Sequence, residues 1–234
     1  MITKLKKKLK NIKLKADPKL NYLRKGVTCN YEWYGSDNGG FYACPDFIDE
    51  NPIVYSFGIG QDISFDKSMI KKHTCTVFGF DPTPKSIQWV KDNVTEKNFK
   101  FYEFGIGEKT EKTTFFLPLN EMHVSGSYVQ QSNVSEIRSV EVQMKSLFDI
   151  AKELGHDHIN VLKMDIEGAE YDIIEGIINS NLKIDQILIE FHDRFFEEKL
   201  KSQKVVEMFQ NKGYEIFAVS DTFEEVSFIK KGLL

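Results

Sequence analysis

The sequence has little cysteine and no long apolar run. Its 234 residues contain three cysteines, Cys29, Cys44 and Cys75, which are too far apart for a disulfide framework or a zinc-binding pattern. No apolar stretch approaches the roughly 18 residues that cross a bilayer, and the charged start of the chain lacks the apolar core of a secretory signal. We therefore expect a protein of the reducing cytoplasm.

Basic residues are scarce outside the first part of the chain. Residues 1–25 contain ten lysines or arginines and one acidic residue, whereas the remaining 209 residues contain 21 basic and 34 acidic residues. An acidic body repels phosphates, which argues against a nucleic-acid partner. We interpret residues 1–25 as a basic leader and residues 26–234 as one folded domain.

The leader allows two interpretations. Leu5, Leu9 and Ile12 recur at helical spacing among lysines, as in a basic helix that lies on an anionic membrane surface or on a partner. A solvated segment that packs lightly on the acidic body explains the composition equally well, and we favour it. A weak membrane-surface contact of residues 1–15 stays open, and nothing in the sequence indicates an oligomeric state.

Short apolar runs alternate with helical patterns after Gly35. The expected strands are residues 53–57, 75–80, 99–104, 159–164 and 186–191, and the expected helices are residues 65–72, 84–93, 146–154, 168–179 and 198–212. This alternation predicts an α/β fold with a mainly parallel sheet. The runs 214–220 and 226–231 predict a closing antiparallel pair. The stretch 113–142 has weak periodicity, and we expect an irregular loop over residues 117–133.

The segment VYSFGIGQDISFD, residues 54–66, places Gly58 and Gly60 directly after the first of these strands. Ligands of open parallel sheets bind beyond the carboxyl ends of the strands, and glycines let the backbone approach them closely. Asp81 ends the next strand, where a carboxylate binds the hydroxyls of a cofactor ribose. The pattern predicts a cofactor site formed by Phe57, Gly58, Ile59, Gly60, Asp81 and Pro82.

The loop lacks the third glycine of the dinucleotide motif GxGxxG, because Ile63 occupies that position. Asp62 and Asp66 nearby would repel a pyrophosphate but suit the sulfonium and ammonium groups of S-adenosylmethionine. The chain also lacks the Tyr-x-x-x-Lys pair of short-chain dehydrogenases and the Gly-Lys-Ser/Thr of a phosphate-binding P-loop. Helix capping is an alternative explanation for Asp62 and Asp66, and a plain turn is the alternative for Asp81.

The segment INVLKMDIEGAEYDIIEGI, residues 159–177, resembles the signature of the FkbM-type methyltransferases. GSDNGGFYACPDFI, the glycine loop, VFGFDPTP and ILIEFHD resemble further segments of one branch of that family, so that the resemblance covers residues 35–192. DIEGAE is its most specific part. Ser56 departs from the family, because methyltransferase loops often carry an acid at that position.

The resemblance implies a Rossmann-like class I methyltransferase domain over residues 26–234, with seven strands and a final antiparallel strand. It also implies S-adenosylmethionine as the cofactor and methyl transfer to an oxygen of a small molecule or saccharide. Phe104 and Gly105, which begin a second FGIG, would then flank the adenine, although a simple glycine turn is the alternative. Asp62 and Asp165 would also face the cofactor.

Acidic and imidazole groups gather where the expected fourth and fifth strands end. An alcohol acceptor needs its proton removed, and an imidazole has an ordinary pKa near 6.5. We therefore predict that His192 and Asp165 are catalytic, with His192 as the proton acceptor; a packed surface histidine is the alternative. Asp165, Glu190 and His192 could instead share a divalent cation, but the spacing is generic and we predict no resident metal.

Other functions stay open at this point. The alternatives are an NAD-dependent oxidoreductase, which the acidic loop disfavours, and a membrane-peripheral module that binds the cofactor without turnover. A base methyltransferase of nucleic acids usually carries Asn/Asp-Pro-Pro-aromatic after the fourth strand, where this chain has DIEGAE. The acceptor is expected to contact the loops 31–45, 118–135 and 192–198, whose aromatic and polar side chains suit a saccharide without specifying one.

Overall fold

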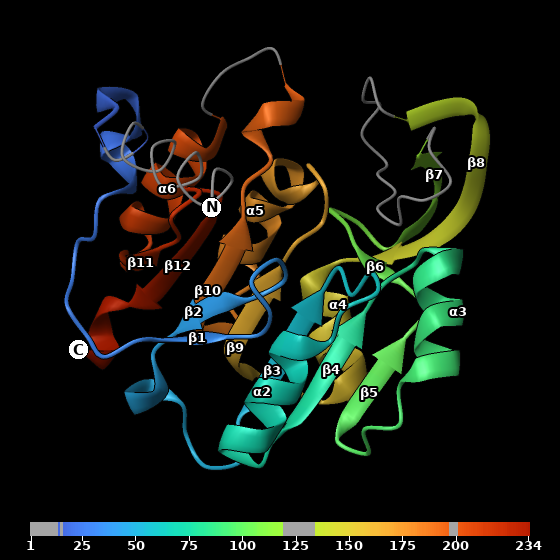
Figure 1. Cartoon of the computed structure of the whole chain (residues 1–234), viewed down its shortest axis with the longest axis horizontal. Coiled ribbons are helices and arrows are strands. Elements are labelled where there is room, and N and C mark those ends of the chain that lie inside the picture. The colour runs from blue at the N-terminus through green and yellow to red at the C-terminus, as the bar shows by residue number, and fades with distance from the viewer. Residues whose placement is uncertain (1–13, 15, 119–133, 197–200) are drawn as a thin grey trace, which may run out of the picture.

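A seven-stranded sheet forms the centre of the computed structural model, which describes residues 14, 16–118, 134–196 and 201–234 (Figure 1). Neighbouring strands are parallel from β10 to β5, whereas β12 runs antiparallel to both β10 and β11. The predicted fold class is thus confirmed. In spatial order the strands are β11 (Tyr214–Val219), β12 (Glu225–Lys230), β10 (Lys183–Glu190), β9 (His158–Met164), β3 (Ile53–Phe57), β4 (Thr76–Phe80) and β5 (Phe99–Tyr102).

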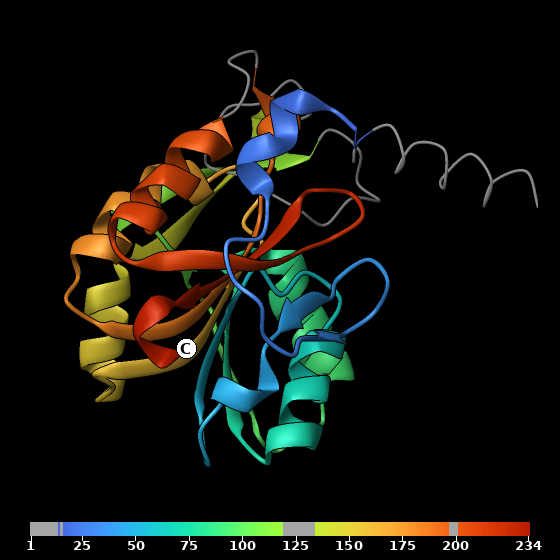
Figure 2. The ribbon, with the colours of Figure 1, turned by 90° about the vertical axis from the view of Figure 1, so that its left-hand side faces the viewer.

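Helices cover both faces of this sheet. One face carries α4 (Leu147–Leu154), α5 (Glu170–Asn179) and α6 (Lys201–Asn211), and the other carries α2 (Ser64–His73) and α3 (Pro84–Asn93) (Figure 2). Each predicted helix is present, with ends that differ by at most three residues from the prediction. The result is the three-layer arrangement that alternating strands and helices predict.

The strands are apolar on both sides because each face is covered. In β3, Val54 belongs to the apolar core that includes Met69 of α2, whereas Tyr55 belongs to the core that includes Ile174 of α5. All four side chains are fully buried. Burying one such side chain contributes roughly 1.5–3 kcal/mol, so the two cores fix the sheet and hold the strand ends in place.

Local capping explains where α4 begins and ends. The hydroxyl of Ser146 accepts a hydrogen bond from the backbone N–H of Asp149 at 3.1 Å, which satisfies one of the free donors of the first turn. Gly155 ends the helix with φ of 74°, a conformation that glycine adopts without strain. The chain then turns directly into β9, which carries a large part of the site.

Two parts of the chain form strands that the sequence did not predict. β1 (Glu32–Tyr34) and β2 (Phe41–Ala43) pair as a hairpin, and β6 (Gly105–Ile106), β7 (Glu111–Pro118) and β8 (Val134–Lys145) form a second sheet. The predicted irregular loop over 117–133 is therefore wrong at its start, because Leu117 and Pro118 belong to β7. Phe115, Val142 and Met144 bury one face of the second sheet, so its pattern has the period of two typical of strands. From residue 119 on, the predicted loop lies outside the described residues.

The end of the basic leader packs on the domain. The 3₁₀ helix η1 (Pro18–Leu23) places Leu23 in the core, and the hydroxyl of Tyr22 lies 2.7 Å from Ser202 Oγ on α6. The boundary at residue 26 stays a prediction, but these contacts show that ordered packing begins before it. The predicted amphipathic pattern over residues 5–12 lies outside the described residues.

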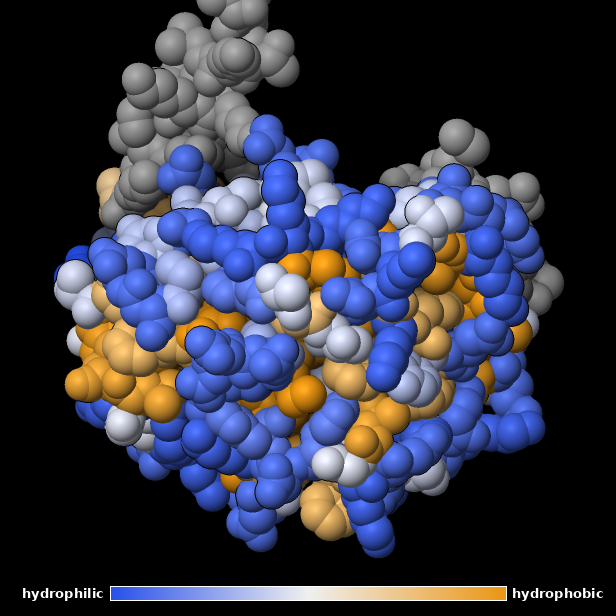
Figure 3. Space-filling view, turned by 90° about the horizontal axis from the view of Figure 1, so that it is seen from below, coloured by the Kyte–Doolittle hydropathy of each residue, from blue (hydrophilic) through white to orange (hydrophobic). Residues whose placement is uncertain are grey.

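The face of the molecule seen from below is mixed rather than apolar (Figure 3). Figure 3 shows the face seen from below, where hydrophilic residues separate small apolar patches. Within the described ranges, no helix is long and apolar enough to cross a membrane. The remaining short helices are η2 (Pro45–Phe47), η3 (Asp193–Phe195) and η4 (Lys231–Leu233).

Candidate active site

A cavity of about 240 Å³ opens at the carboxyl ends of β3, β4 and β9. Its wall consists of the glycine loop after β3, residues 80–83 after β4, and residues 165–167 after β9. The second sheet contributes Phe115 and Met144. Parallel strands bring their carboxyl ends to one edge of a sheet, which is why residues far apart in the sequence meet here.

Glycine is required at the start of the loop. Gly58 has φ of 78°, and a Cβ atom at this position would lie 1.6 Å from the carbonyl oxygen of Asp165. The loop after β3 and the turn after β9 can therefore touch only because Gly58 has no side chain. Gly60 has φ of 55° and would meet nothing within 4 Å, so its face of the loop is open.

Asp81 holds the glycine loop in place. Its Oδ2 accepts hydrogen bonds from the backbone N–H groups of Ile59 at 3.0 Å and Gly60 at 2.9 Å. Its Oδ1 accepts from the backbone N–H and the hydroxyl of Thr83, at 2.9 and 2.7 Å. These four bonds use the roughly four acceptor positions of a carboxylate. Asp81 lines the cavity as predicted, but its observed role is to shape the loop, and ribose binding stays a prediction.

Lys163 holds the same loop through its backbone carbonyl groups. This lysine is buried within β9, and its Nζ donates to the carbonyl oxygens of Gly58 at 2.8 Å and Phe57 at 3.2 Å. A buried ammonium group is costly unless it is paired, and these two carbonyls supply part of that pairing. The loop is thus held through its N–H groups by one side chain and through its carbonyl groups by another.

Asp62 joins the glycine loop to the turn between β1 and β2. Its Oδ2 accepts from the Ser36 hydroxyl and its Oδ1 from the backbone N–H of Ser64, both at 2.7 Å. Burial alone would raise the pKa of Asp62, but these hydrogen bonds outweigh burial and lower the pKa below its ordinary value. Asp62 therefore places a negative charge on the cavity wall, beside Asn38 and Gly39 of the turn.

His192 lies at the centre of a carboxylate cluster. Its Nδ1 is 2.8 Å from Oε1 of Glu170, a hydrogen-bond distance. Its Nε2 faces three further carboxylate oxygens, Asp165 Oδ1 at 3.7 Å, Glu167 Oε2 at 3.6 Å and Glu190 Oε1 at 3.5 Å. The imidazole is fully buried, and Nε2 has no hydrogen-bond partner.

The DIEGAE turn arranges this cluster. Glu167 has φ of 55°, which is uncommon for a residue with a side chain, and Gly168 follows with φ of 97°. Oε1 of Glu170 accepts hydrogen bonds from the backbone N–H groups of Ile166 and Gly168, at 3.2 and 3.3 Å. Glu170 therefore fixes both the strained turn and the ring of His192. Backbone strain of this kind is often found at functional sites.

The cluster shifts the pKa values of Glu190 and His192. Burial raises the pKa of Glu190, and the neighbouring Asp165 adds to this, so that the pKa reaches about 8. Burial would lower the pKa of His192, but the carboxylates of Glu170, Asp165 and Glu190 outweigh it and raise the pKa to about 10. The cluster holds more negative charge than one imidazole neutralises, and it therefore attracts a cation or a proton.

The structure brings together nine of the ten predicted cofactor residues: Phe57, Gly58, Ile59, Gly60, Asp62, Asp81, Pro82, Gly105 and Asp165 all line the cavity. Phe104 is not part of the lining. Its ring packs against Phe80 at a centroid distance of 5.5 Å, with Lys145 Nζ 4.3 Å from the ring centre. His192 also lies outside the lining, behind Asp165, so its role as direct proton acceptor stays a prediction that this geometry does not favour.

Sequence reasoning missed Lys163 and Glu170. A lysine inside the apolar run INVLKM was a usable signal, because a charged residue in a buried strand needs a partner. Glu170 lies in the first turn of α5, where the helix dipole favours any carboxylate, and nothing in the sequence shows that its carboxylate turns back to His192. Phe115 and Met144 were missed because no strand was predicted at β7 or β8.

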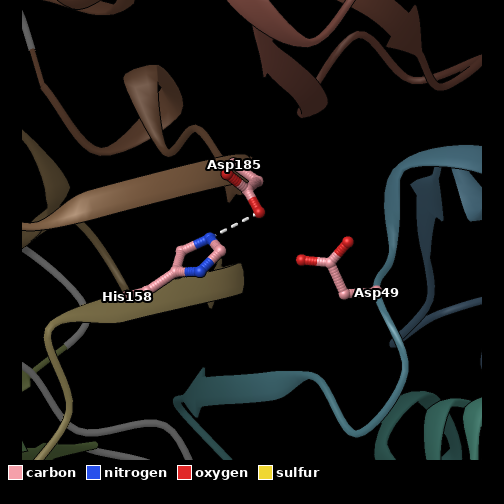
Figure 4. Close-up of side chains that lie close together, drawn as sticks. All are labelled: Asp49, His158 and Asp185. Carbon is pink, nitrogen blue, oxygen red and sulfur yellow. Dashed lines mark hydrogen bonds and ion pairs between the residues drawn. The ribbon is translucent and has the colours of Figure 1, made fainter.

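A second group of titratable side chains lies away from the cavity. His158 begins β9, Asp185 lies near the start of β10, and Asp49 belongs to the loop before β3 (Figure 4). Here the imidazole contacts a carboxylate directly, with Nε2 of His158 2.6 Å from Oδ2 of Asp185. This group joins the amino ends of two strands. It differs from the His192 cluster in that Nε2 of His158 is paired, whereas Nε2 of His192 is not.

The cavity suits S-adenosylmethionine better than a dinucleotide. The open face at Gly60 leaves room for a ligand against the loop. The carboxylates of Asp62 and Asp165 lie on the wall and would repel a pyrophosphate, whereas their contact with the sulfonium and ammonium groups stays a prediction. The fold and this site together define a Rossmann-like class I methyltransferase that uses S-adenosylmethionine.

The family follows from comparison with known proteins. The model of the methyltransferase FkbM domain matches residues 54–216, which is more than half of the chain. The chain belongs to this family, as the DIEGAE segment indicated.

Two relatives and one solved structure show how distant the likeness is. The 2-O-methyltransferase NoeI of Sinorhizobium fredii is 23% identical over 68% of this chain and 71% of its own length. Methyltransferase 1 of Beauveria bassiana is 26% identical over 65% of this chain and 69% of its own length. The crystal structure of Aeropyrum pernix fibrillarin with bound S-adenosyl-L-methionine has a TM-score of 0.42 and 10% identity, over 89% of this chain and 85% of that one.

Proposed function

We propose that this protein transfers a methyl group from S-adenosylmethionine to a hydroxyl oxygen of a saccharide, a glycan precursor or another small metabolite. The observation that carries the proposal is the pair of carboxylates, Asp165 and Glu167, on the cavity wall beside the glycine loop. Carboxylates bind hydroxyl groups and accept their protons. The name of the relative NoeI, a 2-O-methyltransferase, supports oxygen as the acceptor atom.

The bound cofactor supplies an electrophilic methyl group, and its transfer to the hydroxyl oxygen breaks the bond to sulfur and releases the hydroxyl proton. The chain's own contribution is positioning and proton removal, and positioning can supply up to roughly 7–11 kcal/mol in favourable cases. Gly58 and Gly60, held by Asp81 and Lys163, form the support for the cofactor. Asp165 and Glu167 both line the cavity and face His192. We assign Asp165, whose backbone contacts Gly58 of the glycine loop, to orient the hydroxyl and to accept its proton.

The acceptor would enter beside the turn between β1 and β2. Asn38 and Gly39 of this turn line the cavity, which supports an acceptor contact within residues 31–45. Trp33 and Tyr42 of the hairpin pack edge to face, with centroids 4.9 Å apart. The other two expected loops, 118–135 and 192–198, fall largely or partly outside the described residues.

The proposal is tested by incubating the purified chain with S-adenosylmethionine and a panel of nucleotide sugars and oligosaccharides. We expect one acceptor to gain a methyl ether on a hydroxyl oxygen, identified by mass spectrometry and NMR. Asp165→Asn should lower turnover roughly 10²–10⁴-fold, the usual contribution of a positioned acid–base group, while the affinity for S-adenosylhomocysteine changes far less. Methylation that occurs only on nitrogen or carbon acceptors would refute it.

A further inference from the structure

We propose that Asp165, Glu190 and His192 form a binding site for one divalent transition-metal ion at the edge of the cavity. The sequence offered this only as an alternative, since acidic and imidazole residues at strand ends are common. The structure adds the distances, the burial and the unpaired nitrogen that the sequence cannot show. The three side chains each offer one ligand atom, and these atoms lie within 4.8 Å of one another.

The spacing of the ligand atoms fits a shared ion better than it fits hydrogen bonds. Nε2 of His192 is 3.7 Å from Asp165 Oδ1 and 3.5 Å from Glu190 Oε1. Both distances exceed the roughly 2.7–3.2 Å of a hydrogen bond. Two ligand atoms that are each about 2.1 Å from an ion, at a roughly tetrahedral angle, lie about 3.4 Å apart.

The unpaired nitrogen points to the same conclusion. Nε2 of His192 is completely buried and has no hydrogen-bond partner, while Nδ1 is held by Glu170 at 2.8 Å. A carboxylate that binds one ring nitrogen fixes the proton there and directs the lone pair of the other nitrogen outward, which is the usual arrangement of a metal-binding histidine. Without an ion, Nε2 carries a proton whose N–H group is buried without an acceptor at bonding distance, and a bound ion would take the place of that proton.

The charges around the nitrogen also favour a cation. Glu167 Oε2 lies 3.6 Å from Nε2, so that three carboxylates surround it. Arg194 lies 3.5 Å from Glu190, but it is closer to Glu224, at 2.8 Å. An imidazole with carboxylates suits manganese, iron or zinc better than magnesium, which prefers oxygen ligands alone.

The position of the site links it to methyl transfer, and this part of the inference rests on the proposed function. His192 and Glu190 form the buried side, with 1% and 13% of their side chains exposed, whereas Asp165 is 25% exposed and lines the cavity. An acceptor hydroxyl can reach an ion from the cavity side. Coordination would lower the pKa of that hydroxyl and direct its oxygen toward the methyl group.

Direct metal binding tests the site without any acceptor. Full-length protein, freed of metal with a chelator, is titrated with Mn²⁺ in the presence of S-adenosylhomocysteine, and free Mn²⁺ is followed by its EPR signal. We expect one Mn²⁺ per chain. Glu190→Gln and His192→Ala should each weaken binding at least about tenfold, and Glu170→Gln about 10–100-fold, as for the loss of a supporting hydrogen bond.

His158→Ala is the matched control, because it removes a histidine from the group at the opposite ends of β9 and β10 and should leave Mn²⁺ binding unchanged. Circular dichroism and S-adenosylhomocysteine affinity show whether each variant is folded. If His192→Ala does not fold, the nearly isosteric Glu190→Gln decides the test. Absence of stoichiometric Mn²⁺ binding to the wild type, or its loss in His158→Ala alone, would overturn the inference. Mn²⁺ binding without any detectable O-methylation would leave the metal site standing and count against the proposed function only.

Discussion

The contact between the glycine loop after β3 and the turn after β9 depends on Gly58. Its backbone meets the carbonyl oxygen of Asp165 where any side chain would overlap that atom, and its positive φ adds to the requirement for glycine. Lys163 donates a hydrogen bond to the carbonyl oxygen of Gly58, so the loop and the turn cannot move apart easily. A single methyl group added at Gly58 would therefore disturb the geometry of the cavity.

We predict that Gly58→Ala lowers the affinity for S-adenosylhomocysteine by about 2 kcal/mol or more, roughly thirtyfold, and also lowers the melting temperature. Calorimetry and thermal unfolding measure the two effects. Gly155→Ala is the control, because Gly155 also has a positive φ of 74° but a Cβ there meets nothing within 4 Å. The control should lose about 1 kcal/mol of stability and keep its affinity. Equal affinities in the two variants would show that the close approach does not matter.

Asp66 gives a second prediction at the residue scale. It is fully buried in α2, and burial raises its pKa from the ordinary value of 3.8 to about 6, although the charge of Lys163 acts in the opposite direction. The charge of Asp62 adds to the increase in the pKa of Asp66, and the hydroxyl of Ser56 acts against it. The folded state therefore binds a proton more tightly than the unfolded state, and stability falls as the pH rises from about 4 to about 6.

Asp66→Asn should remove this pH dependence. The variant should match the wild type near pH 4 and exceed its free energy of unfolding by on the order of 2–3 kcal/mol at pH 7. Urea unfolding at the two pH values measures the difference. If the advantage of the variant were the same at both values, Asp66 would not titrate in this range.

At the scale of elements, the sequence predicted the buried strands and the helices between them well. Runs such as IVYSF and ILIEF are apolar on both faces, and the helices between them have the matching period, so packing and propensity agree. The strands β1, β2, β7 and β8 escaped prediction because they are short or bury one face only. Alternation such as Val140, Val142 and Met144 is a weak signal when no neighbouring strand is known.

The site was predictable in position but not in contacts. Carboxyl ends of parallel strands meet at one edge, which is why Asp62, Asp81 and Asp165 were placed correctly around one cavity. Which hydrogen bonds Asp81 makes depends on side-chain directions that a motif does not encode. In the same way, no spacing shows that Glu170 turns back toward His192 and that His192 is buried.

The helix η1 gives a prediction about the leader. Deleting residues 1–15 should leave the melting temperature and the affinity for S-adenosylhomocysteine unchanged, because the leader residues that pack on the core in the described part of the chain belong to η1. Deleting residues 1–23 should lower the melting temperature by several degrees, since it removes the buried Leu23 and the contact of Tyr22 with Ser202. Thermal unfolding of both deletions decides this. Equal melting temperatures would show that η1 adds nothing to the stability of the domain.

At the scale of the whole molecule, apolar side chains stabilise the sheet, and the polar groups of the candidate site lie together at one of its edges. Two apolar cores fill both sides of the sheet, and within the described residues the glycine loop, the DIEGAE turn and the His192 cluster all meet at one edge. The body of the chain is acidic, with 34 acidic against 21 basic residues after residue 25. That balance favours a cofactor that carries positive groups over one that carries a pyrophosphate.

The most direct test of this account is calorimetric titration of the purified chain with S-adenosylhomocysteine and, separately, with NAD. The account predicts one S-adenosylhomocysteine per chain and binding of NAD at least about a hundredfold weaker, a difference of roughly 3 kcal/mol. Asp62→Asn should reduce this preference, because it removes a negative charge from the cavity wall. Tight NAD binding together with no response to S-adenosylhomocysteine would contradict the account.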